Sequence, residues 1–157
     1  MALAPGMKAP EFTLHDVDRK ERSLKEYLGK KTLLAFFPAV FTSICTKELC
    51  LFRDTLSSFE GMDAHVIAIC VDAPASNKAF AQSCNLNFPI LSDYSRTAIR
   101  AYDVVHDGFG GMNNYQAAKR AVFVLDRESI IRYCWIADHP GLEPPYDEVN
   151  HALALIS

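Results

Sequence analysis

The sequence lacks a long apolar run, a strong excess of charge of one sign and an even number of cysteines. Its longest apolar stretch, residues 33–41, contains Pro38, and it is far shorter than the roughly 20 apolar residues that a membrane-spanning helix needs. The net charge of −3 gives no basic surface of the kind that binds nucleic acid or an anionic membrane. We therefore expect neither a membrane span nor a nucleic-acid partner.

The five cysteines do not fit a framework of structural disulfides, because the number is odd and a chain of this size needs no such staples. Residues 1–10 contain no apolar stretch long enough for a secretory signal. We therefore expect a reducing, cytoplasmic setting, in which cysteines serve as core residues, metal ligands or reactive thiols. No Cys-x-x-Cys pair is present, so we expect no zinc site.

Other common catalytic patterns are missing as well. The glycine-rich stretch that begins at Gly108 has Asn113 where a dinucleotide-binding loop needs a third glycine. No Gly-x-Ser-x-Gly sequence is present, which argues against a serine hydrolase. We expect neither a nucleotide cofactor nor a metal.

The composition is that of one folded domain. The chain has 157 residues, of which 50% are hydrophobic, and no repeat or break in composition divides it. Its length is close to that of a typical single domain, which we expect to span residues 1–157.

Apolar segments alternate with helical patterns along the chain. We predict strands at 11–16, 32–37, 64–71, 88–91, 121–125 and 130–136, and helices at 43–61, 74–84, 96–102 and 145–156, with a loop at 106–116. This order indicates an α/β fold with helices on both faces of the sheet. The last two strands form a hairpin, so the central sheet is predicted to be mixed.

Cys45 has the most informative surroundings. Thr42 is a suitable N-cap, which makes Cys45 the third residue of the helix that follows the strand at 32–37. The free N–H groups and the dipole of a helix N-terminus favour a thiolate there. Ionising most of an ordinary thiol at neutral pH takes about 3.4 kcal/mol, whereas a helix end supplies at most ~2 kcal/mol. We therefore expect a further donor, such as the Thr42 hydroxyl, and a cation from elsewhere in the chain.

The pattern Pro38-x-x-x-Thr42-x-x-Cys45 resembles the active-site signature of the peroxiredoxins, which are thiol peroxidases on a thioredoxin-like fold. The longer sequence from Thr42 to Cys50 is similar to the bacterioferritin-comigratory-protein/PrxQ branch. Residues 88–93 and 120–126 resemble further segments of the family. The resemblance implies a thioredoxin-like α/β domain with a central mixed sheet flanked by helices.

The resemblance also implies roles for individual residues. Cys45 would attack a hydroperoxide, either hydrogen peroxide or a small organic hydroperoxide, and become a sulfenic acid. Thr42 would bond both the thiolate and the peroxide, Arg120 would stabilise the thiolate and the leaving oxygen, and Pro38 would shield the sulfur from water. Glu48 either orients the arginine or threonine or is an exposed helix charge. No metal, flavin or haem is implied, and thioredoxin or a similar dithiol would recycle a monomer or homodimer.

Three routes for resolving the sulfenic acid stay open. The resemblance implies Cys50, but in a regular helix its Cα lies roughly 8.7 Å from that of Cys45, beyond the ~7 Å limit for a disulfide. The first helical turn would then have to unwind after oxidation. Cys84, near the end of the helix at 74–84, and an external thiol are the alternatives. Cys70 and Cys134 lie in predicted strands and are expected to be core residues.

Two other classes of function compete with the peroxidase. A disulfide oxidoreductase on this fold would have a Cys-x-x-Cys pair, and Thr42 occupies the position of its first cysteine. A non-catalytic binding or chaperone module would keep the fold, have an ordinary thiol at Cys45 and consume no peroxide.

Overall fold

The computed structural model describes residues 2–61 and 64–156. The side chains of residues 55–61 are not described, so Leu56 and Phe59, which have the spacing of an apolar helix face, lie outside the described residues. No helix within the described ranges is both long and apolar enough to cross a membrane.

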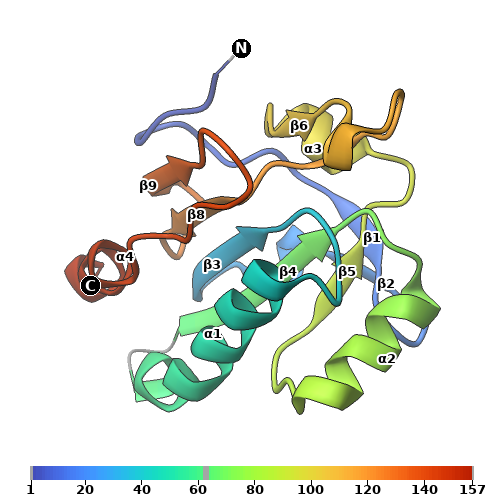
Figure 1. Cartoon of the computed structure of the whole chain (residues 1–157). Helices are drawn as coiled ribbons and strands as arrows, with labels where there is room; N and C mark the ends of the chain where they lie inside the picture. The colour runs from blue at the N-terminus through green and yellow to red at the C-terminus, as the bar shows by residue number, and fades with distance from the viewer. Residues whose placement is uncertain (1, 62–63, 157) are drawn as a thin grey trace.

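The described strands form a seven-stranded sheet in the order β2-β1-β5-β4-β3-β8-β9 (Figure 1). Their bounds are β1 (Thr13–His15), β2 (Glu21–Ser23), β3 (Lys31–Phe36), β4 (Ala64–Cys70), β5 (Ile90–Ser92), β8 (Ala121–Leu125) and β9 (Ile131–Ile136). The pairs β3–β4 and β4–β5 are parallel, while β3–β8, β8–β9, β1–β2 and β1–β5 are antiparallel. The predicted mixed sheet is confirmed.

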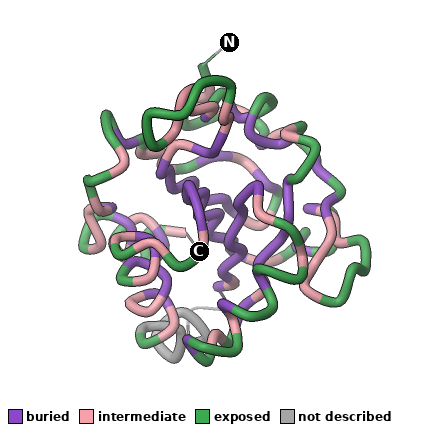
Figure 2. The backbone as a smooth tube through the Cα atoms, turned by 45° about the vertical axis from the view of Figure 1, so that its right-hand side comes forward, coloured by how far each residue is buried: buried purple, intermediate pink, exposed green. Residues whose placement is uncertain are grey.

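Helices lie on both faces of this sheet, as predicted. The face that carries Leu33 and Val66 packs against α1 (Ser43–Gly61), α2 (Pro74–Cys84) and α4 (Tyr146–Leu155). The opposite face packs against α3 (Thr97–Ala101), a 3₁₀ helix at Leu24–Tyr27 and the N-terminal segment. Figure 2 shows the buried backbone concentrated in the centre, between these two layers.

Strand β3 lies in the interior of the sheet and fixes the position of the loop that leads to α1. All six of its residues are buried, because β4 and β8 pair with its two edges and helices cover both of its faces. This explains why the sequence shows an unbroken apolar run there rather than an alternating one. Pro38 ends the run, and α1 begins a few residues later at the same end of the sheet.

Local sequence signals account for the helix ends. Pro74 occupies the first turn of α2, and Asn85 closes that helix in the left-handed conformation, with φ of 51°. The Asp93 carboxylate accepts hydrogen bonds from the backbone N–H groups of Ala98 at 3.1 Å and Ile99 at 2.8 Å. Asp93 therefore caps α3, although Arg96 holds the N-cap position.

The sequence prediction missed the shortest elements. Strand β2 pairs with β1, so the polar first thirty residues contain a hairpin. The predicted loop at 106–116 contains a 3₁₀ helix at Phe109–Gly111, and its ends are joined by a small second sheet of β6 (Val105–His106) and β7 (Ala117–Ala118). These elements have two or three residues each, too few for a hydrophobic period to be recognised.

Candidate active site

Cys45 is the third residue of α1, as the sequence predicted. The backbone N–H of Thr46 donates to the carbonyl of Thr42 at 2.9 Å and closes the first helical turn. The Cys45 side chain is 1% exposed. The sulfur therefore combines a position at the positive end of a helix with shielding from bulk water.

The loop before α1 is tied to the end of strand β4. The N–H of Phe37 donates to the carbonyl of Ile69 at 3.0 Å, and the N–H of Val40 donates to Asp72 Oδ2 at 3.0 Å. Phe41 adopts a left-handed backbone with φ of 64°, and its ring packs edge-on against Phe80, with centroids 5.2 Å apart. The start of α1 is thus held by the sheet and by α2.

Arg120 is the cation that the sequence argument required. It precedes β8, is only 2% exposed, and lines the same cavity as Cys45, near enough for that sulfur to raise the pKa of the guanidinium. Its Nη1 donates to Glu48 Oε1 at 2.7 Å, while Nε and Nη2 donate to the carbonyl of Pro140 at 3.3 and 2.9 Å. Burial alone would lower the pKa of Arg120, but the Glu48 carboxylate and the Cys45 sulfur raise it. The guanidinium is therefore a fixed positive charge beside the sulfur.

Glu48 is the positioning partner of that arginine. It is fully buried, and of its two oxygens Oε2 has no hydrogen-bond partner among the described residues. Burial raises the pKa of Glu48 to about 7, although the Arg120 guanidinium lowers it; Glu143 raises it slightly further. Of the two roles left open by the sequence, the structure selects orientation of the arginine over an exposed helix charge.

Thr42 lies at the site, but its hydroxyl makes a different bond from the one expected. Its Oγ1 donates to the carbonyl of Ala39 at 2.8 Å. The hydroxyl has one hydrogen, so in this structure that hydrogen is not directed at Cys45. The expected donation from Thr42 to the sulfur is corrected here: the oxygen is available to a ligand as an acceptor.

A cavity of about 240 Å³ opens next to the sulfur. Its lining includes Pro38, Thr42, Cys45 and Arg120, which are four of the five site residues that the sequence singled out. Ser43, Ile44, Phe109, Pro140 and Gly141 complete the described lining. No sequence signal marked Phe109, Pro140 or Gly141 as site residues. The 3₁₀ helix at Phe109–Gly111 and the loop at Pro140 reach the site only through the tertiary fold.

The fifth predicted site residue, Cys50, lies outside this cavity. It follows Cys45 within the continuous helix α1, so a disulfide between them requires the helix to unwind, as predicted. Cys50 instead packs in the same core cluster as Cys84, the last residue of α2. Burial raises the pKa of Cys50, the neighbouring Cys84 raises it further, and Arg53 lowers it.

The remaining cysteines behave differently from each other. Cys70 is fully buried in β4 and donates to Asn77 Oδ1 at 3.2 Å, which confirms it as a core residue. Cys134 in β9 is half-buried and packs at the edge of the core. Among the described residues, no group of three or more His, Cys, Asp or Glu side chains could hold a metal ion.

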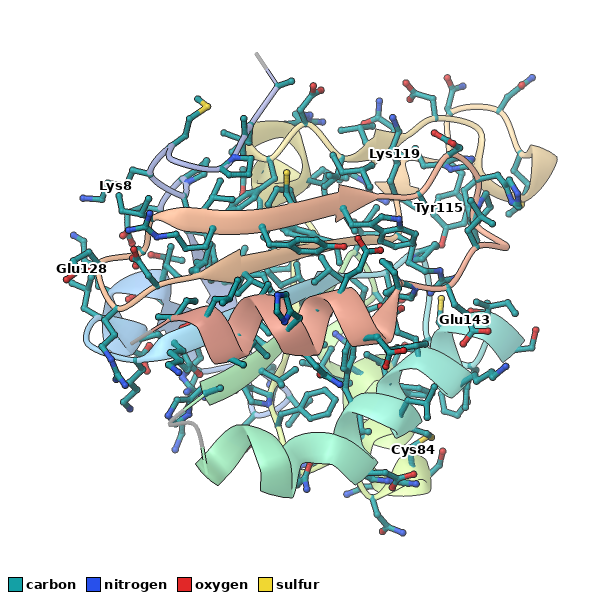
Figure 3. The ribbon with its side chains drawn as sticks, turned by 90° about the vertical axis from the view of Figure 1, so that its left-hand side faces the viewer. Lys8, Cys84, Tyr115, Lys119, Glu128 and Glu143 are labelled. Carbon is teal, nitrogen blue, oxygen red and sulfur yellow. The ribbon has the colours of Figure 1, made fainter. Side chains whose placement is uncertain are left out.

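A larger cavity, of about 760 Å³, lies at the opposite end of the β8–β9 hairpin, where Figure 3 shows Glu128. Its described lining comes from the turn between these strands, from Arg132 and Tyr133 of β9 and from the C-terminal segment that contains α4, and it includes no cysteine. The buried thiol and the buried guanidinium therefore make the smaller cavity the candidate active site.

Comparison with known proteins agrees with this site. The profile of the AhpC/TSA family matches residues 5–134. The chain is 37% identical over 133 residues to "Peroxiredoxin Q, chloroplastic" of Triticum aestivum, an alignment that covers 85% of this chain and 59% of the wheat protein. It is 40% identical over 131 residues to "Alkyl hydroperoxide reductase E" of Mycobacterium bovis, with 82% of each chain covered.

Solved structures show the same fold. The crystal structure of peroxidoxin BcpB from Mycobacterium tuberculosis superposes with a TM-score of 0.85 at 27% identity and covers 99% of both chains. A peroxiredoxin-like protein from Aquifex aeolicus superposes with a TM-score of 0.87 at 26% identity, over 98% of this chain and 88% of the other. The thioredoxin-like α/β fold is thereby confirmed. Because the family profile spans most of the sequence, the chain belongs to the AhpC/TSA family, as a peroxiredoxin like the Q and Bcp proteins and hence a member of a group of thiol-dependent peroxidases.

Proposed function

We propose that this protein reduces hydrogen peroxide and small organic hydroperoxides through a sulfenic acid at Cys45. The observation that carries the proposal is the position of the Cys45 sulfur, which is buried at a helix N-terminus, interacts with the Arg120 guanidinium and borders a 240 Å³ cavity. An anion held there is a ready nucleophile.

The first step follows from the groups that face the cavity. The Cys45 thiolate attacks the terminal peroxide oxygen, the S–O bond forms as the O–O bond breaks, and the leaving alkoxide or hydroxide takes up a proton. Arg120 stabilises the charge that develops on the leaving oxygen. Thr42 Oγ1 accepts a hydrogen bond from the peroxide, because its own hydrogen is already given to Ala39.

The size of the cavity supports small substrates. Liquid water occupies roughly 30 Å³ per molecule, so 240 Å³ leaves room for a hydrogen peroxide molecule and for a short alkyl group. Pro38, Ile44 and Phe109 provide apolar walls for that group.

Resolution by Cys50 is the route we propose for the second step. Its thiol attacks the sulfenic acid, and water leaves as the Cys45–Cys50 disulfide forms. The unbroken helix from Ser43 to Gly61 means that the first turn must open for this bond. Direct attack by Cys84 or by an external thiol is the competing route.

The remaining parts of the proposal rest on the sequence. A single domain over residues 1–157, acting as a monomer or homodimer in the cytoplasm, would be recycled by thioredoxin or a similar dithiol. The protein would use neither a metal nor an organic cofactor, since cysteine sulfur carries the redox change.

The deciding experiment is peroxide consumption with dithiothreitol as the reductant. Cys45→Ser should reduce consumption to the background rate, while Cys134→Ser, a change at a half-buried cysteine outside the cavity, should leave it unaltered. Persistent turnover in Cys45→Ser would contradict the proposal. No consumption by the unmodified protein would favour the non-catalytic binding or chaperone module.

A further inference from the structure

Two cysteines outside the reactive cavity already face each other across two helices. Cys50 on α1 and Cys84 at the end of α2 pack in the same core cluster, near enough for Cys84 to raise the pKa of Cys50. Arg53, one helical turn after Cys50, donates through Nη1 to the backbone carbonyl of Cys84 and ties the two helices together at this point. Cys84 is 8% exposed and Cys50 is half-buried.

This pair is better placed for a disulfide than Cys45 and Cys50 are. A bond between Cys45 and Cys50 requires the start of α1 to unwind, because both residues belong to one continuous helix. A bond between Cys50 and Cys84 joins residues of two helices that already pack in one core cluster and are tied by the hydrogen bond from Arg53 to the Cys84 carbonyl. The folded structure therefore favours the second bond over the first.

We propose that Cys50 and Cys84 form a disulfide between α1 and α2 that takes over the oxidation of Cys45 and returns Cys45 to its thiolate form. The inference rests on the proposed function, because the sulfenic acid at Cys45 supplies the oxidising equivalent. It extends that function by a step in which two cysteines act in sequence.

The steps balance without any further oxidant. The Cys50 thiol and the Cys45 sulfenic acid give a Cys45–Cys50 disulfide and water. The Cys84 thiolate then attacks the Cys50 sulfur, so that the Cys50–Cys84 bond forms and the Cys45–Cys50 bond breaks. Cys45 leaves as a thiolate, and the proton from the Cys84 thiol passes to solvent.

The direction of the exchange follows from the leaving groups. Thiol–disulfide exchange is faster when the departing sulfur is the better-stabilised anion. Cys45 departs into the field of Arg120 and of a helix N-terminus, whereas Cys50 has a raised pKa through burial and the nearby Cys84. Attack by Cys84 on Cys50 therefore expels Cys45.

This transfer of the disulfide from Cys45–Cys50 to Cys50–Cys84, called the relay below, has a consequence that can be counted. With the disulfide moved to Cys50 and Cys84, Cys45 is free to react with a second peroxide before any reductant acts. One chain should therefore consume two equivalents of hydrogen peroxide in its fast phase, and end with a sulfenic acid on Cys45. Without the relay it should stop at one.

The test uses the reduced full-length chain, freed of reductant and mixed with one or two equivalents of hydrogen peroxide. Trypsin separates the three cysteines, because cleavage after lysine and arginine places Cys45 in residues 32–47, Cys50 in 48–53 and Cys84 in 79–96. After alkylation, one equivalent should give a disulfide between peptides 48–53 and 79–96, with Cys45 alkylated. Two equivalents should both be consumed, and dimedone should then label Cys45.

Matched serine variants sharpen the count. Cys84→Ser should consume one equivalent and accumulate the Cys45–Cys50 disulfide, whereas Cys134→Ser should consume two, like the unmodified chain. A lasting Cys45–Cys50 or Cys45–Cys84 disulfide in the unmodified chain, with consumption limited to one equivalent, would overturn the relay. If no peroxide is consumed and Cys45 remains alkylatable, the peroxidase proposal itself fails, and the two failures are thus distinguishable.

Discussion

Two arginines lie beside cysteines in this molecule, and their surroundings differ. Arg120 is buried, pairs with the fully buried Glu48 and bonds the carbonyl of Pro140 twice. Arg53 has a side chain that is 28% exposed, and its ion-pair partner Asp54 is 61% exposed. The first cation faces the Cys45 sulfur and the second faces the pair of Cys50 and Cys84.

The difference shows how burial changes the effect of a cation on a neighbouring sulfur. A charge removed from water acts strongly on a neighbouring anion, whereas an exposed charge is screened by solvent and salt. Cys45 therefore has a strong, fixed stabiliser for the attacking and leaving states. Cys50 and Cys84 have a weak stabiliser, which suits thiols that react after the first step.

The largest expected effect comes from Arg120→Lys, which keeps the charge and loses the planar set of donors. Lysine cannot hold Glu48, the Pro140 carbonyl and the sulfur at the same time. We expect the second-order rate constant for Cys45 oxidation to fall by about 10²-fold or more, measured by stopped-flow peroxide consumption without reductant. Arg53→Lys is the matched control and should stay within about threefold of the original rate. Equal losses of this rate constant in the two variants would contradict the expected difference between the buried and the exposed arginine.

Glu48→Gln should change how stability depends on pH. The pKa of Glu48 is about 7 in the folded state, against 4.5 for an unperturbed glutamate, so the folded state holds this proton more tightly. The contribution of this proton to the free energy of unfolding is complete below about pH 4.5. It is lost as the pH rises through 7, a decrease of about 3 kcal/mol. The substitution leaves the other charged and titratable residues around position 48 in place, namely Arg120, Cys45, Glu143 and Tyr146.

Urea unfolding at pH 5 and pH 8 measures this slope. The decrease should be present in the unmodified chain and in Glu21→Gln, which changes an exposed carboxylate, and should be largely absent in Glu48→Gln. An undiminished slope in Glu48→Gln would show that other groups produce it.

Arg53→Ala should affect the second step and spare the first. Arg53 lowers the pKa of Cys50, so its loss leaves less thiolate and should slow disulfide formation at pH 7 by roughly two- to fivefold. Because the arginine is partly exposed, 0.5 M salt should slow the unmodified chain in the same direction. Acid-quenched disulfide mapping gives this rate, and a tenfold loss in Cys45 oxidation would place Arg53 in the first step instead.

The smallest effect is expected from Lys47→Ala. Lys47 pairs with Glu143 at 3.0 Å and links the start of α1 to the segment before α4, where Figure 3 shows Glu143 beside α1. The lysine side chain is 61% exposed, so its loss should cost less than about 0.5 kcal/mol in thermal unfolding. A loss of stability above about 1 kcal/mol would mean that an exposed ion pair near the site contributes more to stability than the small effect expected of exposed charges such as Arg53.

The sequence predicted the core of the fold because its central strands are long and continuously apolar. Strands β3, β4 and β8 have the unbroken hydrophobic runs of strands covered on both faces. Strands β2, β6 and β7 could not be predicted in this way, because two or three residues show no period. The position of Cys45 in α1 followed from the strand, the proline and the N-cap, which are all local signals.

The partners of that cysteine depend on contacts between distant segments. Arg120 was identified through the family resemblance, and its bond to Glu48 joins residues 72 positions apart. Neither the burial of Glu48 nor the contact between Cys50 and Cys84 has a local signature, because both depend on how helices pack. The hydroxyl bond of Thr42 to Ala39 is local, but the sequence does not distinguish it from a bond to sulfur.

The left-handed backbone of Phe41 bears on the opening of α1. An L-residue in this conformation has a free energy higher by roughly 1–2 kcal/mol than in the right-handed region, and Phe41 holds it with φ of 64° at the junction just before the helix. If the first turn unwinds on oxidation, this residue is free to relax, and part of the free-energy cost of unwinding is offset. Phe41→Gly removes the strain, so it should slow formation of the Cys45–Cys50 bond; an unchanged rate would show that the helix opens without help from this junction.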